Sequence, residues 1–133
     1  MGYLLGIDLG GSSVKAVAVK PDGTALARFN ESFDSERPMH FAQTIRTLVR
    51  RLQAERGVLP DRIGVSAPGL AARDGRSIAY MPGRLHGLVD LVWADHLGFA
   101  KPIPVLNDAH AALLGEVWQG AARGCQNVIL LTL

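Results

Sequence analysis

A glycine-rich turn near the beginning of the sequence carries the strongest chemical signal. Asp8 precedes two adjacent glycines, Gly10 and Gly11, and two hydroxyl side chains, Ser12 and Ser13, come next. Adjacent glycines let the backbone approach a ligand closely, and the N–H groups of such a turn can surround phosphate oxygens. The Asp8 carboxylate could hold Mg²⁺ through water. The alternative is a tight hairpin in which Asp8 stabilises only its own turn.

This turn differs from two common nucleotide-binding motifs. A dinucleotide fingerprint would read Gly-x-Gly-x-x-Gly and open a helix, whereas a strand is predicted after Ser13. A Walker A loop would require Gly-Lys-Ser/Thr, which the turn does not contain. The turn is therefore neither of these motifs.

Two further segments place polar side chains after predicted strands. Asn107 and Asp108 lie between a strand and a helix, where Asp is a preferred N-cap. A carboxylate at the C-terminal end of a strand also faces the crevice in which α/β sheets bind ligands. There Asp108 could accept a proton from a hydroxyl that attacks phosphorus. Ser66-Ala67-Pro68-Gly69 could present a hydroxyl and backbone groups to a polyol, or be a plain strand-ending turn.

Short strands would hold these segments in place. Three strands joined by tight turns are predicted at Tyr3–Leu9, Val14–Val19 and Thr24–Phe33. Later strands are predicted at Arg62–Ser66, Ser77–Tyr80, Ile103–Leu106 and Asn127–Leu133. Pro104 favours a sheet edge or a strand-start position for the third of these, because proline cannot donate to the ladder. The last is almost wholly apolar, so we expect it to be buried on both faces.

Apolar residues at helical spacing predict the helices that pack on the sheet. The predicted helices are a stripe over Phe41–Leu52 that ends at Gly57, a short helix Leu91–Leu97, and a helix from Asp108 that stops at Gly120. Asp34 or Ser35 would cap the first and Asp90 the second, and Trp93 and Trp118 are expected in the core. The order of elements predicts an α/β fold with a mixed sheet of the five-stranded type, flanked by helices.

Composition excludes several classes of protein. The 133 residues carry a net charge of +2 and are 48% hydrophobic, which describes one domain rather than a charged disordered tail. Arg46, Arg50 and Arg51 are interpreted as a solvated helix face, so no nucleic-acid partner is predicted. The single cysteine, Cys125, excludes an intrachain disulfide or a multi-cysteine zinc site and is interpreted as an apolar filler. No apolar run reaches membrane-span length, and a cytoplasmic location without membrane contact is expected.

The three chemical segments, in this order, resemble the ROK family of bacterial sugar kinases and repressors, within the actin/hexokinase-like ATPase superfamily. The segments that carry the resemblance are Gly6–Ser12 followed by Lys15, Gly64–Gly69, Asn107–Glu116 and Asn127–Leu133. The resemblance covers essentially the whole chain. It implies a ribonuclease H-like, actin-like ATPase domain, with residues 1–133 as the amino-terminal domain of a sugar kinase and the nucleotide-binding domain outside this chain.

The resemblance also implies roles for individual residues in ATP-dependent phosphorylation of a sugar hydroxyl. Asp108 would be the general base, and Asn107 would position the sugar together with Ser66, Pro68 and Gly69. ATP phosphates and Mg²⁺ would be held by Asp8, Gly10, Gly11, Ser12, Ser13 and Lys15. Because phosphoryl transfer needs two lobes that close, the 133 residues alone are expected to be inactive.

Some features depart from the family pattern. The family has an Asn-rich sugar loop ending in Gly-Trp, whereas Tyr80–Gly87 contains neither Asn nor Trp, so the sugar preference stays open. Arg84 in this loop could meet an anionic sugar or face solvent. Zinc is expected only in the domain outside the chain, and no helix-turn-helix precedes the kinase-like part, which disfavours the repressor branch.

The alternatives are a non-catalytic sugar-binding module and another actin-like ATPase. Self-association through an uncovered apolar surface is also expected.

Overall fold

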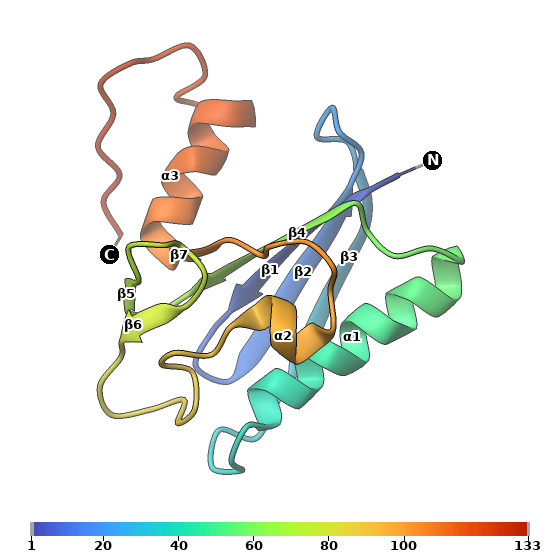
Figure 1. Cartoon of the computed structure of the whole chain (residues 1–133). Helices are drawn as coiled ribbons and strands as arrows, with labels where there is room; N and C mark the ends of the chain where they lie inside the picture. Colours follow the sequence, from blue (N-terminus) through green and yellow to red (C-terminus); the bar gives the residue numbers. More distant parts are fainter. Residues whose placement is uncertain (1, 133) are drawn as a thin grey trace.

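One mixed five-stranded sheet organises the molecule (Figure 1). The computed structural model describes residues 2–132. The strands are β1 (Leu4–Leu9), β2 (Ser13–Val19), β3 (Ala25–Ser32), β4 (Arg62–Ala67) and β7 (Val105–Asn107), in the spatial order β3-β2-β1-β4-β7. β2 is antiparallel to β1 and β3, while β1, β4 and β7 are parallel. The predicted α/β class is confirmed, and so is the edge position of the strand that follows Pro104.

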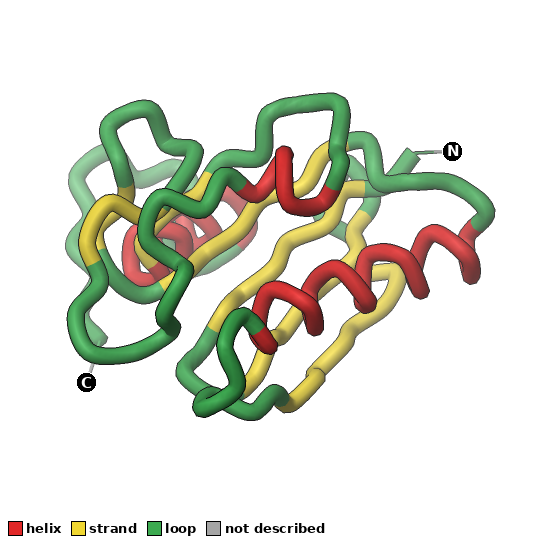
Figure 2. Tube along the Cα trace, turned by 60° about the horizontal axis from the view of Figure 1, so that its bottom comes forward, coloured by secondary structure: helices red, strands yellow, loops and turns green. Residues whose placement is uncertain are grey.

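The hydrophobic core lies on one face of this sheet. Helix α1 (His40–Arg56) and the short helix α2 (Trp93–Leu97) both lie on that face, whereas α3 (Asp108–Gln119) lies behind it (Figure 2). The helix α1 buries Phe41, Ala42, Ile45, Leu48, Val49 and Leu52. These residues recur on one side of the helix, so they meet the buried alternate positions of β1, β2 and β4.

A second, two-stranded sheet consists of β5 (Leu70–Ala71) and β6 (Ile78–Tyr80). It follows β4 and leads into a loop that reaches α2. Gly57 and Gly98, both in the left-handed region, end α1 and α2 where the sequence predicted. None of the helices in the described part of the chain has both the length and the apolar character needed to cross a bilayer.

The predicted N-caps of the first two helices are wrong. The helix α1 begins at His40, after Met39 in the left-handed region (φ 59°) and with no side-chain cap. Asp34 instead closes its own turn, because its Oδ1 accepts a hydrogen bond from the Glu36 N–H at 3.0 Å. Asp90 also adopts a positive φ of 63°, two residues before Val92, which occupies the N-cap position of α2.

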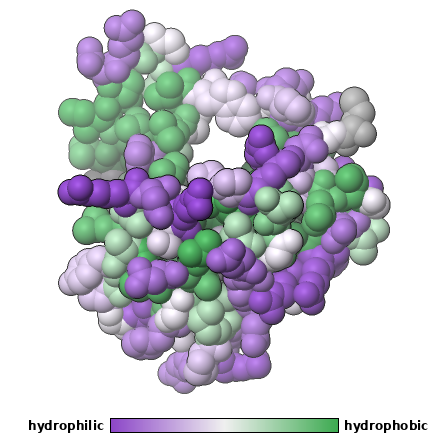
Figure 3. All heavy atoms as spheres, in the orientation of Figure 1, coloured by the Kyte–Doolittle hydropathy of each residue, from purple (hydrophilic) through white to green (hydrophobic). Residues whose placement is uncertain are grey.

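The end of the described chain also differs from the prediction. Residues 127–132 form no strand and pair with none of the strands within residues 2–132, and Leu133 lies outside the described residues. Ile129 is 88% exposed. Trp118 and Cys125 are exposed rather than buried, and α3, to which Trp118 belongs, buries none of its residues. Apolar side chains therefore gather on the surface over α3 and the segment after it (Figure 3).

Candidate active site

The three chemical segments of the sequence converge at one edge of the sheet. Since β1, β4 and β7 are parallel, their carboxyl ends lie together. Asp8 on β1 pairs in register with Ser66 on β4, and Ala67 pairs with Asn107 on β7. Asp108 follows immediately as the first residue of α3. This edge is where α/β sheets place their ligand crevices.

Hydrogen bonds connect these strand ends to one another. The Ser66 hydroxyl donates to Asp8 Oδ1 at 2.7 Å. The Asn107 side chain has two partners: Nδ2 donates to the Gly69 carbonyl at 2.7 Å, and Oδ1 accepts from the Ala109 N–H at 3.0 Å. Asn107, rather than Asp108, is therefore the N-cap of α3, and it also attaches the strand-ending turn after β4 to the helix.

The turn at Gly69 requires glycine at this position. Gly69 has a φ of +100°, and a β-carbon there would lie 2.5 Å from the Tyr80 carbonyl oxygen of β6. A side chain would therefore separate the turn from β6 and move the Gly69 carbonyl away from Asn107.

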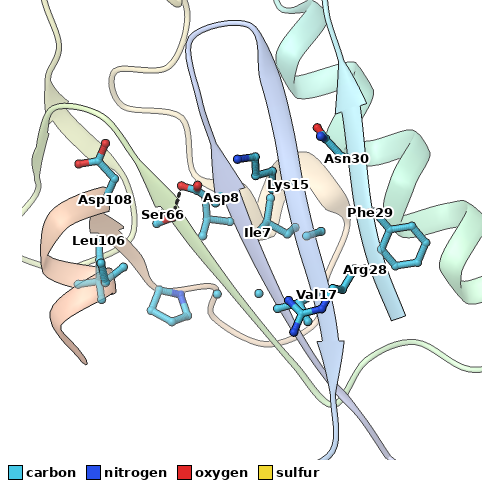
Figure 4. Close-up of a pocket in the computed structure, with 17 residues that line it drawn as sticks. Ile7, Asp8, Lys15, Val17, Arg28, Phe29, Asn30, Ser66, Leu106 and Asp108 are labelled. Carbon is cyan, nitrogen blue, oxygen red and sulfur yellow. Dashed lines mark hydrogen bonds between the residues drawn. The ribbon is translucent and has the colours of Figure 1, made fainter. Parts of the chain in front are cut away.

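A groove of about 640 Å³ lies on the sheet face opposite α1. A row of polar residues crosses it, from Asp108 past Ser66 and Asp8 to Lys15 and Asn30 (Figure 4). The strand residues of this row form one rung of the ladder, because Ser66 pairs with Asp8, Asp8 with Lys15, and Lys15 with Asn30.

Asn30 was not predicted as a site residue. A signal for it existed in the antiparallel arrangement of β2 and β3, which brings a residue of β3 opposite Lys15. Extending the register of the Val19–Ala25 pair beside the turn would place Phe29 opposite Lys15, however. A bulge between Ala18 and Val19 shifts the register by one residue and selects Asn30.

Both carboxylates of the groove remain available to a ligand. Asp8 and Asp108 are exposed, and neither forms an ion pair within the described part of the chain. Asp108 Oδ1 accepts from the Ala109 N–H at 2.8 Å, which leaves Oδ2 free. The Ser66 hydroxyl is directed to Asp8, so it orients this carboxylate rather than facing the Pro68–Gly69 turn.

The remaining predicted residues flank the groove without lining it. These residues are Gly10, Gly11, Ser12, Ser13, Pro68, Gly69 and Asn107. In the β1–β2 turn, the Gly10 N–H donates to the Ser13 carbonyl at 2.9 Å and is not available to phosphate. The Gly11 and Ser12 N–H groups donate to no backbone carbonyl among residues 2–132. The turn therefore offers two free donors.

The donor set fits Mg²⁺ that arrives together with phosphate. Among the described residues, no group of three or more His, Cys, Asp or Glu side chains could enclose a metal ion. Mg²⁺ usually takes one or two protein carboxylates and completes its octahedron with water and substrate phosphates. Asp8 lines the groove and is exposed, so it provides one carboxylate of this kind.

Curated relatives match nearly the whole chain. The glucokinase of Thermotoga maritima is 28% identical over 137 residues, which cover 98% of this chain and 41% of the relative. The xylose repressor of Bacillus subtilis is 24% identical, with 99% of this chain and 35% of the repressor covered. The chain therefore spans about two fifths of the length of the glucokinase it matches.

Solved structures share the fold. The inorganic polyphosphate/ATP-glucomannokinase of Arthrobacter sp. strain KM superposes with a TM-score of 0.76 at 26% identity, covering 95% of this chain and 52% of that one. The ROK family glucokinase of Streptomyces griseus, solved with glucose and AMPPNP, has a TM-score of 0.68 at 25% identity and covers 92% and 38%. The fold is thus that of the actin-like ATPase kinases. The ROK family model matches residues 4–133, and the chain belongs to the ROK family.

Proposed function

We propose that the protein containing this chain transfers the γ-phosphoryl group of ATP to a hydroxyl of a sugar. The observation that carries this proposal is the rung at the carboxyl edge of the sheet, with Asp108 beside it at the start of α3. Both ROK kinases and ROK repressors match the chain, so the site chemistry rather than the family name supports the kinase.

In the proposed mechanism Asp108 is the general base. Its free Oδ2 accepts the proton of the sugar hydroxyl while the hydroxyl oxygen of the sugar forms a bond to the γ-phosphorus. The bond from the γ-phosphorus to the bridging oxygen breaks, and ADP leaves. Asn107 holds the Gly69 turn against the start of α3, so these two elements keep a constant spacing around the sugar.

Residues of β1 and β2 serve the phosphate side of the site. Gly11 and Ser12 offer free N–H groups, Ser13 begins the following strand, and Lys15 adds a positive charge opposite Asp8. Asp8, oriented by Ser66, would hold Mg²⁺ through water. When bound, the metal neutralises charge on the phosphates. We place this reaction in the cytoplasm, and the rest of the nucleotide site in the part of the family's length outside this chain.

One observation favours a second candidate, a sugar-binding module without catalysis. The loop at Tyr80–Gly87 lacks the Asn and Trp of the family's sugar loop, so sugar contacts could persist without the geometry for transfer. The two candidates differ in one measurable property, which is the dependence of turnover on the Asp108 carboxylate.

The deciding experiment compares Asp108→Asn with wild type in the full-length gene product. ADP release is measured with a panel of hexoses, and sugar binding by calorimetry. We expect turnover to fall by roughly 10²–10⁴-fold while sugar affinity is retained, because only proton acceptance is lost. Asp95→Asn, an exposed charge change on α2, is the matched control. Equal turnover of the Asp108 variant and wild type would show that Asp108 has only a structural role at the start of the helix, and it would contradict the mechanism.

A further inference from the structure

The loop between β6 and α2 brings a cation to the β1–β2 turn. If Gly11 carried a β-carbon, that atom would lie 2.9 Å from Arg84 Nη1 and 3.9 Å from Arg84 Cζ. The two segments are more than seventy residues apart in the chain, yet they lie at the same end of the sheet (Figure 1). The guanidinium can approach this closely because Gly11 has no side chain.

The loop is anchored in a way that holds Arg84 in this place. Leu85 and Leu88, on the C-terminal side of Arg84, are 4% and 0% exposed, and the Leu88 N–H donates to the Leu85 carbonyl at 3.0 Å. Leu85 adopts a φ of 52°, a left-handed conformation that is unfavourable for leucine. Gly87 packs against Met39 at the start of α1. Burial of the two leucines therefore offsets local backbone strain, and that strain accompanies the presentation of Arg84.

The arginine and the turn offer donors that the protein does not use. The Arg84 side chain forms no hydrogen bond or ion pair with any of residues 2–132. The N–H groups of Gly11 and Ser12 likewise donate to no backbone carbonyl in that range. A guanidinium beside consecutive free N–H groups is an arrangement that binds oxyanions, because charge-assisted hydrogen bonds and backbone donors act together.

We propose that Arg84, Gly11 and Ser12 form one oxyanion site at the carboxyl edge of the sheet. The site deepens the proposed function and rests on it: the oxyanion belongs to one of the two reactants. The terminal phosphoryl group of the donor and an acidic group on the acceptor sugar both carry the negatively charged oxygens that such a site binds. Arg84 is thereby a substrate-binding residue that sets the preference for one of these reactants.

The test uses the 133-residue chain and follows the amide resonances of Gly11 and Ser12. Tripolyphosphate is the probe for a donor phosphoryl group, gluconate for an acidic acceptor, and glucose for a neutral one. We expect Arg84→Gln to lower the affinity for at least one of the two anions by about tenfold, which corresponds to the loss of one charge-assisted contact. Glucose binding is expected to be unchanged. The anion whose affinity depends on Arg84 identifies the reactant that the site takes.

The matched control is Arg50→Gln, which removes the same charge from an exposed position on α1. If the Arg84 and Arg50 variants bind both anions equally well, the effect is only one of net charge and the site is refuted. Gly11→Ala provides a second variant, because its β-carbon would displace the guanidinium. We expect the double variant Gly11→Ala/Arg84→Gln to bind the anion no more weakly than the single variant with the lower affinity. Independent, additive losses would contradict a shared site.

The outcome can be separated from that of the proposed function. If anion binding is independent of Arg84 while Asp108→Asn still lowers turnover as expected, only the oxyanion site is refuted. If anion binding depends on Arg84 while Asp108→Asn leaves turnover unchanged, the general-base mechanism fails and the site stands.

Discussion

The two faces of the central sheet differ in almost every physical respect. The face under α1 is closed by apolar packing, with Leu5, Ile7, Ile45, Leu48 and Ile63 each at most 3% exposed. The opposite face carries the groove with its carboxylates, lysine and amide. Apolar burial on one face supplies the free energy of folding, so the other face is free to expose groups that would be costly to bury.

The helices on these faces show the same contrast. The helix α1 buries six residues against the sheet, whereas α3 buries none although it also carries Leu114, Val117 and Trp118. These three side chains are between 36% and 48% exposed. An apolar stripe therefore indicates which side of a helix can be buried. It does not indicate that a covering surface is present among the described residues.

Truncating one leucine on each helix gives the largest expected effect. Leu48→Ala on α1 should lower the free energy of unfolding by about 2–5 kcal/mol, because Leu48 is 1% exposed and a cavity would remain. Leu114→Ala on α3, where the side chain is 48% exposed, should change it by no more than about 0.5 kcal/mol. Urea unfolding of both variants measures the difference. Similar losses for the two would show that α3 is covered in solution.

The exposed apolar surface should also mediate self-association. Ile129 and Leu131 are 88% and 84% exposed, and they line a surface hollow together with Leu113 of α3. We expect the mass of the chain in light scattering to rise with concentration, because such patches are commonly interfaces. Ile129→Lys/Leu131→Lys should weaken the association at least about tenfold, since two apolar contacts are replaced by charge.

The control for this experiment adds the same charge to a polar surface. Gln43→Lys/Gln53→Lys changes two exposed positions of α1 and should leave the association unchanged. A wild-type chain that stays monomeric at high concentration would contradict the prediction. Equal weakening by both double variants would attribute the association to net charge instead.

The smallest expected effect concerns the boundary between the two faces, at Asn107. Asn107→Ala removes both the cap of α3 and the hydrogen bond to Gly69, and we expect a loss of about 1–2 kcal/mol. Asn107→Asp keeps an acceptor for the Ala109 N–H but cannot donate to the Gly69 carbonyl. Thermal unfolding should therefore show a smaller loss of stability for Asn107→Asp than for Asn107→Ala. Hydrogen exchange in β5 should increase in both, and unchanged exchange would contradict the role given to this contact.

Much of the fold was predictable because its signals are local. The apolar positions of α1, the glycines that end α1 and α2, and the three amino-terminal strands were predicted within a few residues. The segments around Asp8, Ser66 and Asn107 were predicted to contain the site, and they do converge. The roles of these residues and the domain assignment stay predictions. The caps at Asp34 and Asp90 failed, because neither residue lies at the start of its helix.

The sequence by itself determined which residues could be buried and where the chain turns, because hydrophobic periodicity and turn chemistry depend on neighbours in the chain. Only the tertiary structure decided the composition of the polar rung. A one-residue bulge at Ala18/Val19 brings Asn30 rather than Phe29 opposite Lys15, and register depends on how two strands meet. It also decided that Ile129 and Leu131 lie exposed, because burial requires a second surface. The approach of Arg84 to Gly11 is of the same kind, since two buried leucines anchor a distant loop beside the turn.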